Sequence, residues 1–183
     1  MMRRALLLLV LLLLSSTFLH AQKKRAFTIE DLYRVKNLSD MHVSPDGRTL
    51  LFAVTTSDLA RAKRTSHIWA MDVEGRNPRQ LTIGDKSEYS PSYSPDGRQI
   101  LLISAKDGSS NFYLMSASGG EGRKLTNIST GVSDPVWSPD GKWIAFSSDV
   151  YPECGGSDAC NKKIAERWES GPLKAHMADD LLY

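Results

Sequence analysis

Apolar residues in this chain gather in short runs that polar, turn-forming segments separate. Three of these runs, 49–54, 99–104 and 143–148, are rich in residues that favour β-strands. Each run follows a copy of Ser-Pro-Asp-Gly, which begins at residues 44, 94 and 138. Proline presets φ at the first turn position, aspartate caps its own backbone and glycine tolerates positive φ. The pattern predicts a tight reversal joining two strands, which we expect to be the two inner strands of a larger unit.

A second pattern recurs with the same spacing. Residues 67–75 and 79–82 are echoed by residues 111–120 and 123–126, a shift of 44 positions in both segments. Each copy predicts a strand, a glycine-containing turn and another strand, so one repeat holds four strands. A four-stranded repeat of 44 to 50 residues is typical of a β-propeller blade. The six extra residues of the first repeat are assigned to an exposed hairpin tip at Leu59–Arg64.

The predicted fold is therefore all-β: a partial β-propeller with two complete blades and a third begun, with short helical segments at both ends. The helices are expected at Phe27–Leu38, with Thr28 and Asp31 as a capping box, and at Asn161–Trp168 and Leu173–Tyr183, separated by Gly171-Pro172. The expected boundaries are a signal peptide at 1–21, a linker and helix at 22–42, blades at 43–92 and 93–136, the start of a third blade at 137–150, and a cysteine loop with a helical insertion at 151–183.

Propellers close with about four to eight blades. The third blade of this chain changes character after Phe146. We expect either that the remaining blades belong to a longer protein or that several copies assemble to close the ring.

The N-terminus predicts export. Met1–Arg4 is basic, Ala5–Leu14 is apolar, and Ala21 precedes Gln22 at the expected cleavage site. A membrane anchor is the alternative, but the apolar run is shorter than the roughly 20 residues that span a bilayer. Cleavage there lowers the basic residues from 23 to 21, equal to the 21 acidic ones. A neutral chain gives no reason to expect nucleic acid or, after cleavage, a membrane as partner.

Both cysteines, Cys154 and Cys160, fall in one short segment. Two ligands without a nearby histidine do not make a metal site. In an exported protein the spacing favours a disulfide-closed loop over free thiols.

The remaining polar and aromatic residues suggest no catalytic or cofactor site, and we expect none. His20 belongs to the signal peptide, and His42, His67 and His176 are scattered. The aspartates of the three turns are explained by turn chemistry. Acids that could bind a substrate's amino group are Glu153, Asp158, Asp179 and Asp180, and the spacing selects none of them. The aromatic residues at equivalent blade positions, Trp69 with Tyr113 and Tyr93 with Trp137, are expected in the core.

The opening Thr28–Leu32 and the segment 35–48 resemble the start of the propeller in exported serine peptidases of the prolyl oligopeptidase family. Dipeptidyl-peptidases and acylaminoacyl-peptidases look most similar. The segment from Ser148 to Met177 also resembles an insertion in bacterial members of that branch. TolB-like periplasmic propellers share the Ser-Pro-Asp-Gly repeats.

The resemblance implies a propeller that sits over an α/β-hydrolase domain and admits short peptides. Such enzymes carry a Ser-Asp-His triad, with the serine in Gly-x-Ser-x-Gly. This chain lacks that motif; the nearest stretch, 155–159, has no final glycine. We therefore expect no catalysis from this chain alone, only gating for a parent peptidase. The alternatives are a TolB-like protein-binding propeller and a half-propeller that assembles through its open edges. The sequence leaves the oligomeric state open.

Overall fold

The computed structural model describes residues 25–170, which fall into two units. The N-terminal unit ends at Leu32. The helix at the unit boundary, α2 (Ile29–Arg34), is shorter than the predicted Phe27–Leu38. It ends early because Asn37 and Leu38 pair instead with Thr55 and Val54 in a sheet. The predicted capping pair is present: the backbone N–H of Thr28 donates to the Asp31 carboxylate at 3.0 Å.

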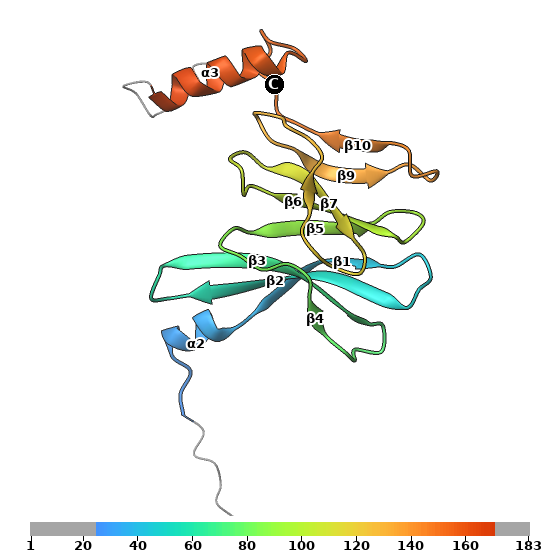
Figure 1. The fold of residues 1–183 in the computed structure, drawn as a ribbon. Helices are drawn as coiled ribbons and strands as arrows, with labels where there is room; N and C mark the ends of the chain where they lie inside the picture. The colour runs from blue at the N-terminus through green and yellow to red at the C-terminus, as the bar shows by residue number, and fades with distance from the viewer. Residues whose placement is uncertain (1–24, 171–183) are drawn as a thin grey trace, which may run out of the picture. The chain divides into compact units, whose positions relative to one another are not determined.

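The larger unit, from Tyr33 onward, is built from three antiparallel sheets that follow one another along the chain, as Figure 1 shows. The first sheet has the order β1-β2-β3-β4, from β1 (Asn37–Val43), β2 (Thr49–Asp58), β3 (Lys63–Asp72) and β4 (Arg79–Gln80). The second repeats it with β5 (Glu88–Tyr93), β6 (Gln99–Ser104), β7 (Asn111–Ser116) and β8 (Arg123–Lys124). The third pairs β9 (Ser133–Trp137) with β10 (Ile144–Ser147).

This topology corrects one prediction. The Ser-Pro-Asp-Gly turn joins edge strand β1 to its neighbour β2, as predicted for the first pair of strands, but the strand before the turn is longer than expected. Each sheet therefore begins several residues before its turn, at Asn37 and Glu88, whereas the predicted blades started at residues 43 and 93. The reason is that the strand before each turn pairs with the strand after it in the same sheet.

The core lies between the sheets. In β6, Ile100 and Leu102 share a buried cluster with residues of the first sheet, whereas Leu101 and Ile103 share a second cluster with Trp137 and Ile144 of the third sheet. Adjacent residues of a strand point to opposite faces. Because both faces of this sheet are covered, β6 is apolar along most of its length. The apolar runs found in the sequence are thus inner strands of stacked sheets.

The three turns share one hydrogen-bond pattern in which serine is as important as aspartate. The hydroxyl of Ser94 donates to the Asp96 carboxylate at 2.6 Å and accepts from the backbone N–H of Gln99 at 3.0 Å. The Asp96 carboxylate also accepts the backbone N–H of Arg98 at 3.1 Å. These bonds lower the pKa of Asp96, and the same pattern lowers that of Asp46 and Asp140. The turn interpretation of these aspartates is confirmed.

The first strands of the three sheets carry a left-handed residue that the sequence did not reveal. Asp40, Ser90 and Asp134 have φ of 53°, 50° and 51° and occupy equivalent repeat positions. In β1 and β5 the residue lies in a bulge of the strand ladder. The bulge turns the backbone N–H of Ser90 toward the Asp40 carboxylate, which accepts it at 3.0 Å. This bond ties the second sheet to the first.

Candidate functional site

A cleft lined largely by polar side chains lies between the second sheet and the helix α3 (Asp158–Ser170) that follows β10. Its volume is about 540 Å³. The walls come from the β6–β7 turn, the β8–β9 connection and one side of α3; they include Asp107, Ser109, Asn127, Ser129, Asp158, Lys162 and Glu166. A smaller hollow of about 290 Å³, lined largely by serine and threonine, adjoins it at Ser109.

Asn111 holds together the wall that the second sheet contributes. This side chain is fully buried. Its carbonyl oxygen accepts the hydroxyl of Thr126 at 2.9 Å and the backbone N–H of Ile128 at 2.8 Å. Its amide donates to the backbone oxygens of Ser109 at 3.1 Å and of Ile128 at 3.2 Å. One residue of β7 therefore fixes both the hairpin turn and the connection that border the cleft.

The insertion after β10 is stabilised by a disulfide and by hydrogen bonds within the insertion. Cys154 and Cys160 form a disulfide, with a Cα–Cα distance of 5.5 Å. The side chain of Asn161, only 2 % exposed, accepts the backbone N–H of Tyr151 at 2.8 Å and donates to the backbone oxygen of Ser157 at 3.0 Å. These links close the loop onto the first turn of α3.

Asp158 joins this insertion to the connection between β8 and β9. The Asp158 carboxylate accepts both the backbone N–H and the hydroxyl of Ser129 at 2.8 Å. The hydrogen bond from the Ser129 backbone N–H lowers the pKa of Asp158 most, and the hydrogen bond from the Ser129 hydroxyl lowers it further. Asp158 at the helix start also suits the positive end of the helix dipole. The orientation of the cleft wall therefore depends on a charge-assisted contact.

The helix begins earlier than predicted, at Asp158 rather than Asn161. Ser157 precedes it and accepts the backbone N–H of Cys160 at 3.4 Å, as an N-cap residue does. Ser157 belongs to the stretch 155–159, which is the nearest approach to Gly-x-Ser-x-Gly in the sequence. In the structure this serine lies at the N-cap of a helix. The second predicted helix, its Gly171-Pro172 break, Asp179, Asp180, His176 and the cleavage site at Ala21 and Gln22 all lie outside the described residues.

The cleft contains three carboxylates, of Asp107, Asp158 and Glu166, and the ammonium group of Lys162. The Asp107 carboxylate accepts the Tyr113 hydroxyl at 2.6 Å. Burial and this carboxylate raise the pKa of Tyr113. Such a surface can hydrogen-bond and neutralise a cationic group. Of the other acids considered, Glu153 is exposed in the cysteine loop. No group of three or more metal-ligating side chains occurs among residues 25–170.

Residues 25–170 contain two histidines, His42 and His67. Neither lines the cleft, and each contacts a polar group of the fold. His67 Nδ1 lies 3.0 Å from the Glu88 carboxylate, which also accepts the Thr82 hydroxyl at 2.9 Å. His42 Nδ1 lies 3.5 Å from the backbone nitrogen of Tyr93. Of the aromatic residues, Tyr93 and Tyr113 are buried, and Trp69 and Trp137 are half-buried. In the described part of the chain, no helix has the length and apolarity to span a membrane.

The chain is a β-propeller protein, because its four-stranded antiparallel sheets stack face to face in chain order. The described residues form two complete blades and two strands of a third blade. The family model "TolB beta propeller domain" matches residues 34–155. The chain belongs to this family, known as PD40.

Two curated relatives are peptidases. Dipeptidyl-peptidase 5 of Porphyromonas gingivalis is 33 % identical over 82 residues, which cover 45 % of this chain and 12 % of the relative. An uncharacterized peptidase of Bacillus subtilis, YuxL, is 36 % identical over 87 residues, which cover 48 % of this chain and 13 % of the relative. The chain thus matches about one eighth of the length of either peptidase.

Two solved structures show the same fold. A putative TolB of Agrobacterium tumefaciens gives a TM-score of 0.52 at 26 % identity, covering 63 % of this chain and 39 % of the other. An acylaminoacyl peptidase of Pyrococcus horikoshii gives a TM-score of 0.54 at 16 % identity, covering 67 % of this chain and 19 % of the other. The resemblance to the propellers of peptidases and of TolB is confirmed at the level of fold and family.

Proposed function

We propose that this chain is the substrate-gating propeller portion of an exported serine exopeptidase, whose hydrolase domain lies in a longer product of the same gene. The parent enzyme would release dipeptides or acylated residues from short peptides. The similarity to two curated peptidases, at 33 % and 36 % identity, is the observation that carries this proposal. The apolar N-terminal segment and the Cys154–Cys160 disulfide support export to an oxidising compartment.

In this role the blades bind and admit substrate, and they do not cleave it. The cleft beside α3 offers carboxylates to the amino group of a short peptide. Its wall is held by the Asp158–Ser129 bonds and by the disulfide loop, so its position is fixed before a peptide arrives. A prepositioned wall reduces the entropy lost when substrate binds.

The test is to sequence the gene past the codon for Tyr183 and to express the whole product. We expect further blades, a Gly-x-Ser-x-Gly domain, hydrolysis of chromogenic dipeptide amides or acylated amino-acid amides, and labelling by a serine-directed fluorophosphonate. The 183-residue chain, assayed beside it, should show neither activity nor labelling. A stop codon directly after Tyr183, or a continuation without a hydrolase domain, would refute the proposal.

A protein-binding propeller without catalysis is the second candidate. The 26 % identity to the putative TolB over 63 % of this chain favours it. It predicts that the complete product ends after about six blades, within the usual propeller range, and that it retains a specific protein partner during purification from the periplasm. Serine-directed labelling of the complete product separates the two candidates.

A further inference from the structure

Four Asp-Gly steps occur in the sequence, at Asp46, Asp96, Asp107 and Asp140. An Asp-Gly step can isomerise, because glycine has no side chain to hinder the attack of its backbone nitrogen on the aspartate carboxyl carbon. The attack requires the carboxyl group to turn toward that nitrogen and come into contact with it. The folded structure therefore decides which of the four steps can react.

Three of the steps belong to the Ser-Pro-Asp-Gly turns, where two donors of the same turn fix the carboxylate. In the second turn the Asp96 carboxylate accepts the Ser94 hydroxyl at 2.6 Å and the backbone N–H of Arg98 at 3.1 Å. The first and third turns repeat these bonds at 2.6 Å and 3.1 Å. The bonds also lower the pKa values of the three aspartates, and a carboxylate that stays charged resists attack by a nucleophile.

The fourth step, Asp107-Gly108, lies in the β6–β7 turn and lacks this arrangement. Among the described residues, the Asp107 carboxylate accepts the Tyr113 hydroxyl at 2.6 Å and no backbone N–H. The N–H of Gly108 donates to the backbone oxygen of Ala105 at 3.2 Å, whereas the glycine N–H groups of the other three steps donate at 2.8 to 2.9 Å. Both residues of the step are exposed, so water reaches them. The carboxyl group of Asp107 is therefore the least restrained of the four.

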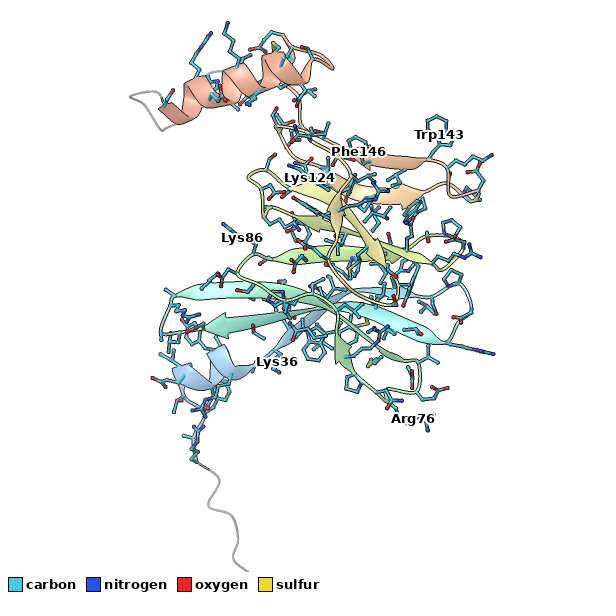
Figure 2. All side chains as sticks on the ribbon, viewed as in Figure 1. Lys36, Arg76, Lys86, Lys124, Trp143 and Phe146 are labelled. Carbon is cyan, nitrogen blue, oxygen red and sulfur yellow. A yellow bond between two sulfur atoms is a disulfide. The ribbon has the colours of Figure 1, made fainter. Side chains whose placement is uncertain are left out.

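The β6–β7 turn lies at the opposite end of the second sheet from its Ser-Pro-Asp-Gly turn, because β5, β6 and β7 are antiparallel neighbours. In Figure 2, Lys86, which precedes β5, marks the first of these ends on the left, and Trp143, which follows the third Ser-Pro-Asp-Gly turn, lies on the right. Asp107 and Gly108 also border the cleft beside α3. A change of the backbone at this step would alter that border.

We propose that Asp107-Gly108 is a site of spontaneous covalent modification, at which the aspartyl residue becomes isoaspartyl. The backbone nitrogen of Gly108 forms a bond to the carboxyl carbon of Asp107. One carboxyl oxygen leaves as water, with the proton of that nitrogen and a proton from solvent, and a cyclic imide remains. Water then adds to the imide carbonyl of the main chain and breaks its bond to the nitrogen.

The product has one more carbon atom in the backbone of the turn, and its free carboxylate is attached directly to Cα of residue 107. The hydrogen bond with Tyr113 and the border of the cleft therefore both change. The reaction needs water as its only co-reactant. This inference does not depend on the peptidase proposal.

The test is incubation of the complete gene product, folded and at neutral pH, in water enriched in heavy oxygen. Each opening of the imide places one heavy oxygen atom in the residue, and enzymatic methylation by an isoaspartyl carboxyl methyltransferase identifies the isomerised form. Trypsin separates the four steps into the peptides 37–48, 87–98, 107–123 and 125–142. We expect peptide 107–123 to take up heavy oxygen at least about tenfold faster than the others. One more hydrogen bond to the carboxylate must break in each of those turns, and tenfold in rate corresponds to about 1.4 kcal/mol.

Two controls separate the effect of the fold from that of the local sequence. In concentrated urea all four peptides should take up heavy oxygen at similar rates, because the turns are unfolded. Ser94→Ala removes one donor of Asp96 and should accelerate uptake in peptide 87–98, whereas Ser116→Ala, at an exposed serine of β7, should not. Uptake in peptide 107–123 of the folded protein no faster than in the others, the same ranking of rates in urea, or no response to Ser94→Ala would each overturn the proposal.

Discussion

Replacing Asn111 with leucine should strongly destabilise the second blade. Leucine has the same branching and the same number of side-chain heavy atoms as asparagine, but it is larger and cannot form any of the hydrogen bonds of asparagine. The change leaves the N–H of Ile128 and the hydroxyl of Thr126 without their acceptor and the backbone oxygen of Ser109 without its donor, in a site that is fully buried. Each buried group without a partner costs about 1–3 kcal/mol. Leucine burial offsets about 1.5–3 kcal/mol of the total.

We therefore expect the free energy of unfolding to fall by about 3 kcal/mol or more, a large part of the 5–15 kcal/mol typical of domains. Urea unfolding followed by tryptophan fluorescence measures it. Asn127→Leu is the matched control, because Asn127 lies in the same connection but is exposed, and it should change stability by less than about 0.5 kcal/mol. A loss below about 1 kcal/mol for Asn111→Leu would show that the buried network does not hold the cleft wall.

Three further predictions concern the turns and the insertion. The pKa values of Asp46, Asp96 and Asp140 lie below the ordinary 3.8, so the stabilisation that these carboxylates give the protein is complete above that pH and is lost as the pH falls through the lowered values. The urea concentration at the midpoint of unfolding should therefore fall over that pH range. It should fall less in the variant in which all three aspartates are replaced by asparagine. Replacing Cys154 and Cys160 with serine should lower the stability of the insertion by about 2 kcal/mol, because the disulfide closes a loop with a sequence separation of six residues. Hydrogen exchange should accelerate in α3 and stay unchanged in β6. Equal acceleration in both elements would contradict the inference that the disulfide stabilises only the insertion. Asp158→Asn should speed exchange at the backbone N–H of Ser129, whereas Glu153→Asn should not.

Much of the cleft could not be predicted from the sequence. Asn111 and Asn161 organise its two walls, but neither stands in a motif, because a buried asparagine acts through whichever backbone groups the fold brings to it. The serine of each repeated turn could have been recognised from its recurrence at 44, 94 and 138. Its hydroxyl bonds both the aspartate and the strand that follows, so serine is required as much as aspartate.

The repeat period and the turn chemistry by themselves determined the blades, the number of strands in each and the reversal at every Ser-Pro-Asp-Gly. These are local properties, since a proline, an aspartate and a glycine restrict the backbone wherever they occur in this order. The tertiary structure decided what depends on distant partners: that β1 is an edge strand of its own sheet, that Asp40 accepts Ser90, and that Asp158 ties α3 to the second blade. Such contacts join residues separated by 29 to 50 positions, and no short pattern records which of them the folded chain brings together.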